Sequence, residues 1–154
     1  MIPTSMVAGC GIQWILRQWT ERTPDKPFLI WEPPERDGRT WTYGELSRDV
    51  DAVAGALFEQ CVRPGNFVII YLQNSPEFII SWFACAQLGA IAVSTNTRSM
   101  ASDINYFADH VSTVGAVTQP AFAELVHESA PNPEFLAFTD NGAGQPARIP
   151  DLPH

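Results

Sequence analysis

Few residues of this 154-residue chain carry nucleophilic or acid–base chemistry, and those few are widely separated. His110 and His127 have no serine, cysteine or carboxylate at a spacing that is typical of a catalytic set. Asp109 precedes His110, but neighbouring residues on a helix point to different parts of its surface. We therefore predict surface or half-buried histidines and no catalytic residue.

The cysteines Cys10, Cys61 and Cys85 are far apart, and they form neither a CxxC motif nor a Cys/His ligand pattern. An odd number without such spacing predicts free thiols of a reducing cytoplasm and no metal site. Cys85 lies in an apolar stretch, where a thiol behaves as a small hydrophobic side chain.

Composition excludes several classes of protein. The formal net charge is −8, and Lys26 is the single lysine, so a nucleic-acid surface with clustered cations is not expected. With 45% hydrophobic and 17% charged residues, the chain is predicted to be globular. No apolar run approaches the ~18 residues of a membrane span, and no basic segment precedes an apolar one as in a secretory signal.

The clearest structural pattern lies in the middle of the chain. Apolar runs at 67–72 and 90–93 predict two strands, and residues 75–88 between them predict a helix. Pro76 suits the first helical turn, and Gly89 suits the helix end. Because this helix is apolar on nearly every side, we expect it to lie against a sheet and beneath a further layer.

A second helix start is marked by a capping box in which Thr42 is the N-cap and Glu45 the third helical residue. Trp41 and Leu46 occupy the positions of a hydrophobic staple. Before it, the sequence predicts a helix from residue 12 to about residue 22 and a hairpin of strands 28–31 and 39–42. We expect the tryptophans to pack in the core or at a subdomain interface: Trp14, Trp19, Trp31, Trp41 and Trp82.

Further helices are expected at 104–111 and 122–126, and further strands at 114–118 and 135–138. Residues 67–138 therefore read βαβαβαβ, which predicts an α/β fold with a parallel sheet and covering helices, preceded by the N-terminal helix and hairpin. We expect one domain over residues 1–138 and a disordered tail over 139–154, where Asn, Gly, Gln and Pro predominate.

Five short segments occur in an order and spacing that resemble one enzyme superfamily: TYGEL at 42–46, PGNFV at 64–68, NSPEF at 74–78, LGAIAV at 88–93 and NTR at 96–98. Together they resemble the N-terminal part of the adenylate-forming (AMP-binding) superfamily, of the acyl-CoA synthetase or ligase type. The resemblance covers roughly residues 12–138. Departures include Cys61, close to a usual glycine, and Asn66, in place of a usual aspartate.

The resemblance implies ATP, Mg²⁺ and coenzyme A as cofactors of the complete enzyme, and a small carboxylic acid as its substrate. The family's phosphate loop, rich in Ser, Thr and Gly and carrying a Lys, has no counterpart in this sequence, and neither does its C-terminal catalytic lysine segment. Lys26, the single lysine, is not at a position where it could replace either of these family lysines. We therefore expect the isolated chain to be inactive and to bind none of these cofactors tightly.

Arg98 is the one site residue that the resemblance transfers. In some benzoate-type ligases the arginine of this Asn-x-Arg contacts a phosphate of coenzyme A, and a guanidinium fork suits phosphate. The alternative is a solvated loop arginine.

Three functions remain open at this stage. The first is the N-terminal fragment of an acid–CoA ligase. The second is a non-catalytic remnant or interaction module with the same fold, and the third is a fragment of a peptide-synthetase adenylation domain. In each case the helix at 75–88 or a sheet edge should be partly uncovered, which predicts self-association.

Overall fold

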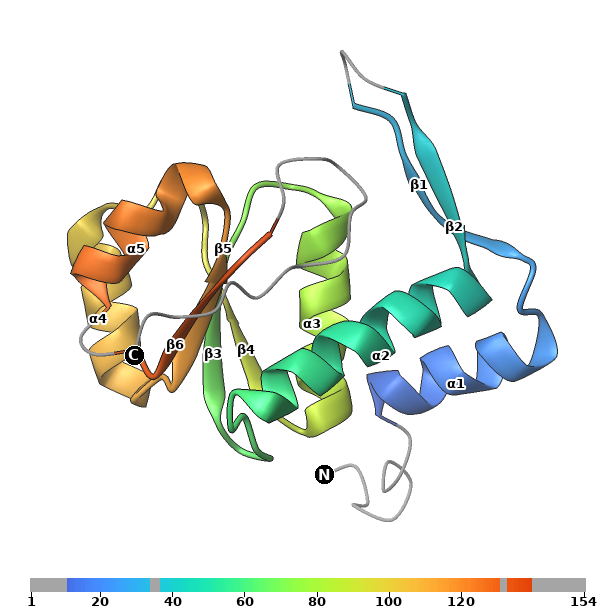
Figure 1. Cartoon of the computed structure of the whole chain (residues 1–154), viewed down its shortest axis with the longest axis horizontal. Helices are drawn as coiled ribbons and strands as arrows, with labels where there is room; N and C mark the ends of the chain where they lie inside the picture. Colours follow the sequence, from blue (N-terminus) through green and yellow to red (C-terminus); the bar gives the residue numbers. More distant parts are fainter. Residues whose placement is uncertain (1–10, 34–36, 131–132, 140–154) are drawn as a thin grey trace, which may run out of the picture.

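A computed structural model of the chain describes residues 11–33, 37–130 and 133–139 (Figure 1). The helices are α1 (Ile12–Arg22), α2 (Tyr43–Glu59), α3 (Pro76–Leu88), α4 (Ala101–Val111) and α5 (Ala123–Ser129). The strands are β1 (Pro27–Trp31), β2 (Arg39–Thr42), β3 (Phe67–Tyr71), β4 (Ile91–Ser94), β5 (Gly115–Thr118) and β6 (Phe135–Phe138).

The last four strands form one sheet in the order β4-β3-β5-β6, and every neighbouring pair is parallel. Val68 of β3 pairs with Ala92 on one side and with Gly115 on the other. The predicted α/β fold with a parallel sheet and covering helices is therefore confirmed, as is the N-terminal helix with its antiparallel hairpin β1–β2.

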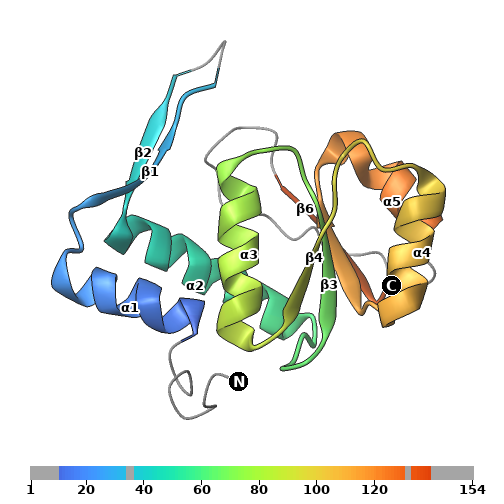
Figure 2. The same ribbon diagram turned by 180° about the vertical axis from the view of Figure 1, so that it is seen from behind.

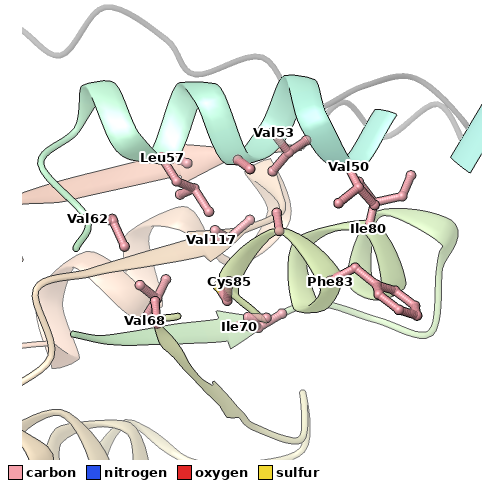
Figure 3. Close-up of a cluster of buried hydrophobic side chains, with 14 of the residues drawn as sticks. Val50, Val53, Leu57, Val62, Val68, Ile70, Ile80, Phe83, Cys85 and Val117 are labelled. Atoms are coloured by element: carbon pink, nitrogen blue, oxygen red, sulfur yellow. The ribbon is translucent and has the colours of Figure 1, made fainter. Parts of the chain in front are cut away.

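Helices cover both faces of the sheet (Figures 1 and 2). Val68 and Ile70 of β3 belong to the core that α2 and α3 complete, and this core appears in Figure 3. Ile69 and Tyr71 belong to a second core, which includes Ile104 of α4 and residues of α5. Alternate residues of one strand thus pack into opposite layers, as expected for a pleated strand buried on both faces.

Helix α3 begins and ends where the sequence indicates. The Ser75 hydroxyl accepts a hydrogen bond from the Phe78 N–H, and Pro76 occupies the first turn. The helix ends at Gly89, whose φ of +70° is the left-handed conformation that glycine adopts without strain. α3 lies between the sheet and α2, so the predicted burial is confirmed.

The hairpin is attached to α2 at its base. The expected capping box between Thr42 and Glu45 is present, and Trp41 is fully buried. The Trp41 indole N–H donates to Asp49 Oδ2 at 2.9 Å, and the Arg39 guanidinium lies 4.2 Å from the indole centroid. From this base the hairpin projects away from the sheet (Figures 1 and 2).

The other tryptophans are less buried than Trp41. Trp14, Trp19 and Trp82 are each about two-fifths exposed, at 42%, 40% and 38%. Apolar periodicity identifies the inward face of a helix, but it does not reveal whether a further layer covers that face.

The expected tail at 139–154 lies outside the described residues except for Thr139. That residue is buried, and its N–H donates to the Thr118 carbonyl at 2.8 Å. In the described part of the chain, no helix combines the length and apolar character needed to cross a membrane.

Candidate functional site

Arg98 lies in the loop that follows β4, at the edge of the sheet where the parallel strands end. The loop after β3 leads to α3 on one face of the sheet, and the loop after β4 leads to α4 on the other face (Figure 2). When neighbouring strands connect to opposite faces, a crevice opens beyond their carboxyl ends, and α/β proteins commonly bind ligands there.

A pocket of about 710 Å³ occupies this position. Two loops and the hairpin contribute its lining: Trp31, Leu72, Gln73, Asn74, Phe78, Ser94, Thr95, Asn96, Thr97 and Arg98. The lining contains one cation and no carboxylate. Amides and hydroxyls around a single guanidinium suit a polar, negatively charged ligand.

The Arg98 side chain is exposed, and among the described residues it has no hydrogen-bond or ion-pair partner. Its main chain is held, since the Arg98 N–H donates to Asn96 Oδ1 at 2.9 Å. A fixed backbone with an unengaged guanidinium is an arrangement that can receive a phosphate in a bidentate manner.

Buried side chains fix the loop from the sheet side. The Thr95 hydroxyl donates to the Ile70 carbonyl at 3.0 Å. The Tyr71 hydroxyl lies 3.1 Å from the Thr97 carbonyl oxygen and 3.0 Å from that of Ser99. Burial raises the pKa of Tyr71, and the negative charge of Asp103 raises it further. The phenol is therefore a protonated donor throughout the neutral pH range.

Comparison with known proteins decides the family. The family described as AMP-binding enzyme matches residues 16–146. The chain belongs to the AMP-binding enzyme family.

Three relatives illustrate this membership in the AMP-binding family. Crotonobetaine/carnitine–CoA ligase of Proteus mirabilis is 29% identical over 140 residues, which are 85% of this chain and 27% of that protein. Acetyl-coenzyme A synthetase of Emericella nidulans is 45% identical over 71 residues, which are 46% of this chain and 11% of that protein. The crystal structure of an anthranilate CoA ligase in complex with anthranoyl-AMP superimposes with a TM-score of 0.73 at 25% identity, covering 82% of this chain and 24% of that one.

This AMP-binding family member spans about a quarter of the length of the first curated relatives that it matches. The family match extends to residue 146, beyond the domain boundary expected at residue 138.

Arg98, the site residue predicted from the sequence, lines this pocket, whereas its neighbours in the lining were not predicted. Gln73 and Asn74 could have been found, because residues that follow consecutive parallel strands meet at one sheet edge. Trp31 could not have been found, because no short-range sequence pattern indicates that the hairpin reaches the pocket. Its indole nitrogen is buried and has no hydrogen-bond partner among the described residues.

The histidines and cysteines considered from the sequence do not form a common site among the described residues. His110 is exposed and stacks on Tyr106, with ring centroids 5.3 Å apart, and His127 is also exposed. Cys61 and Cys85 are free thiols, as expected, and Cys10 lies outside the described residues. Within the described ranges, no three His, Cys, Asp or Glu residues gather as metal ligands would.

Proposed function

We propose that this chain is the N-terminal part of an AMP-forming, ATP-dependent acid–CoA ligase, and that Arg98 binds a phosphate of coenzyme A. The observation that carries the proposal is the unengaged Arg98 guanidinium at a pocket without carboxylates, at the carboxyl ends of the parallel strands. The family match and the relatives, whose names are those of CoA ligases and synthetases, support the reaction class.

In such a ligase a carboxylate attacks the α-phosphate of ATP, which gives an acyl-adenylate and pyrophosphate. The coenzyme A thiol then attacks the acyl carbonyl and displaces AMP. The chemistry that ATP and Mg²⁺ supply is the activation of the carboxylate. The residues of this chain do not fit either group, because no metal-ligand cluster occurs in the described ranges and Lys26, the single lysine, lies over the Trp19 ring.

The role of this chain in the proposal is therefore limited to the coenzyme A end of the reaction. The Arg98 guanidinium would donate to phosphate oxygens, and the polar loop residues of the pocket would orient the nucleotide. We further propose that residues 1–138 are one part of a larger N-terminal domain in the cytoplasm, and that a small carboxylic acid is the substrate of the whole enzyme.

The test is a titration of the purified 154-residue chain with adenosine 3′,5′-bisphosphate, the phosphate-bearing end of coenzyme A, followed by NMR. Binding is expected to be weak, and Arg98→Ala should raise the Kd about fivefold, because an exposed guanidinium–phosphate contact is partly screened by water. The matched control is Arg17→Ala, which removes an exposed arginine from α1 and should leave the Kd unchanged. Equal Kd values for Arg98→Ala and the unsubstituted chain would refute the assignment of Arg98.

The lack of a metal-ligand cluster in the described residues favours a second candidate, a non-catalytic module with the same fold. Assay of ATP–pyrophosphate exchange addresses activity directly, and the proposal expects no exchange above background from this chain alone. The coding sequence downstream of codon 154 separates the two candidates, since a Gly-rich loop with Ser, Thr and Lys in frame belongs only to the ligase.

A further inference from the structure

The loop that carries Arg98 has one contact that ties its centre to the sheet. Tyr71 is the last residue of β3, and its side chain is only 1% exposed. Its hydroxyl lies within hydrogen-bond distance of two carbonyl oxygens, those of Thr97 at 3.1 Å and Ser99 at 3.0 Å. These two residues flank Arg98, so a single buried phenol holds the main chain on both sides of it.

We infer that Tyr71 is a positioning residue, which holds the loop so that Arg98 can meet a phosphate group. The inference rests on the proposed function, because it deepens the role given to Arg98. Tyr71 itself does not line the pocket and need not touch the ligand.

The other contacts of the loop do not substitute for this one. The N–H groups of Arg98 and Ser99 donate to the Asn96 side chain and carbonyl, and these bonds lie within the loop. Thr95 ties only the beginning of the loop, through the Ile70 carbonyl. At the far end, the Met100 N–H donates to Asp103 at the start of α4. Among the described residues, Tyr71 provides the hydrogen-bond link between the sheet and the loop segment from residue 96 to residue 99.

The surroundings of the Tyr71 ring allow its hydroxyl to be removed without disturbing the ring packing. The Tyr71 ring meets the Phe122 ring edge-on, with centroids 5.3 Å apart, and a phenylalanine would keep this contact. Tyr71→Phe therefore removes one oxygen and leaves the ring packing in place. The two carbonyls that lose their donor lie in a part-buried loop that water can reach.

The first measurement is amide hydrogen exchange by NMR. The Arg98 and Ser99 amides are bonded inside the loop, so their exchange reports loop opening. Tyr71→Phe should accelerate both by about tenfold, which corresponds to the loss of one hydrogen bond. The Thr95 amide, bonded to the Ile70 carbonyl, should be unaffected, and Tyr106→Phe, the same change at an exposed tyrosine, should alter none of the three. Unchanged exchange at Arg98 and Ser99 would overturn the inference.

The second measurement couples Tyr71 to Arg98. Tyr71→Phe should raise the Kd for adenosine 3′,5′-bisphosphate about threefold in the unsubstituted chain and have no further effect in the Arg98→Ala background. A purely structural role predicts the same effect in both backgrounds and would overturn the inference. If Arg98→Ala weakens binding while Tyr71→Phe does not, positioning fails and the proposed function stands. If Arg98→Ala has no effect, the proposed function itself fails.

A third measurement uses the unsubstituted chain, so it does not depend on whether Tyr71→Phe folds. A hydroxyl proton shared between two carbonyls exchanges slowly with water and should give a resolved Tyr71 resonance at low temperature. Its protection factor, the intrinsic exchange rate divided by the observed rate, should match that of the Ser99 amide, because both depend on the same opening. A Tyr71 hydroxyl with a much lower protection factor than this amide would overturn the inference.

Discussion

Two free thiols in this chain occupy opposite environments. Cys61 is exposed, at the end of α2, whereas Cys85 is fully buried in α3, beneath α2. Burial raises the pKa of the Cys85 thiol to about 12, because an apolar surrounding disfavours the thiolate. The unfolded chain ionises this thiol near pH 9, so the free energy of unfolding should fall as pH rises from about 9 towards 12.

This contrast predicts selective alkylation. Iodoacetamide at pH 8 should modify Cys61 in the native chain and leave Cys85 unmodified until urea unfolds the protein, as read by mass spectrometry of the chymotryptic peptides. Rapid native modification of Cys85 would show that α3 is not covered as described. Cys85→Ala should also flatten the decline of stability above pH 9.

Single residues were predictable from the sequence when their signal was local. Cys85 lies in an apolar helix, which predicts its burial, whereas the role of Arg98 was taken from the family resemblance and stays a prediction. The contacts of Tyr71 could not be predicted, because the loop carbonyls that its hydroxyl meets are 26 and 28 residues away in sequence. Its apolar neighbours in β3 predict burial alone.

The ends of elements were predictable for the same reason. A capping box, a Ser-Pro helix start and a glycine stop each act within a few residues, and α2 and α3 begin and end accordingly. The order of strands was not predictable, since alternation of strands and helices implies parallel pairing but does not place β3 between β4 and β5. That order decides which loops meet at the pocket.

Cys61 and Gly89 both have a left-handed backbone conformation, which glycine adopts with less strain than other residues. Introducing glycine at the first position and removing it at the second should therefore change stability in opposite directions. Cys61 has a φ of +63°, the left-handed region, close to the place where the family usually has glycine. Cys61→Gly should raise the free energy of unfolding by up to about 1 kcal/mol, as measured by urea denaturation. Gly89→Ala should lower it by about 1–2 kcal/mol, because φ is +70° and the new Cβ would lie 3.3 Å from Pro64 Cβ.

Gly55→Ala is the matched control for Gly89→Ala. Gly55 lies inside α2, and a Cβ placed there meets no atom within 4 Å. Alanine favours helix over glycine, so this substitution should raise the free energy of unfolding by about 1 kcal/mol. A loss of stability at Gly55 equal to that at Gly89 would contradict the conformational explanation.

At the scale of the whole molecule, the described part of the sheet has two edge strands. Among the described strands, β4 pairs only with β3, and β6 pairs only with β5. Ile91 of β4 is 45% exposed, and open edges with apolar side chains can pair with another copy. The expected self-association therefore remains a prediction, now with a defined edge.

Sedimentation velocity at increasing concentration should show reversible dimers of the chain. Ile91→Lys should weaken the dimer about tenfold, because a charge on the edge strand opposes pairing. Ile30→Lys, which replaces an exposed isoleucine of the hairpin, serves as the control and should leave association unchanged. A monomer at all concentrations, or equal effects of the two variants, would contradict pairing through β4.

The parallel sheet also has a practical consequence for handling the protein. The chain leaves β6 on the side of the sheet where the strands end, which is the side of the Arg98 pocket, whereas α1 begins near the opposite side (Figures 1 and 2). A fluorophore, affinity tag or sensor-chip tether joined directly after β6 would crowd the Arg98 pocket. The same attachment ahead of α1 would leave the entrance open, so immobilised assays should anchor the chain there.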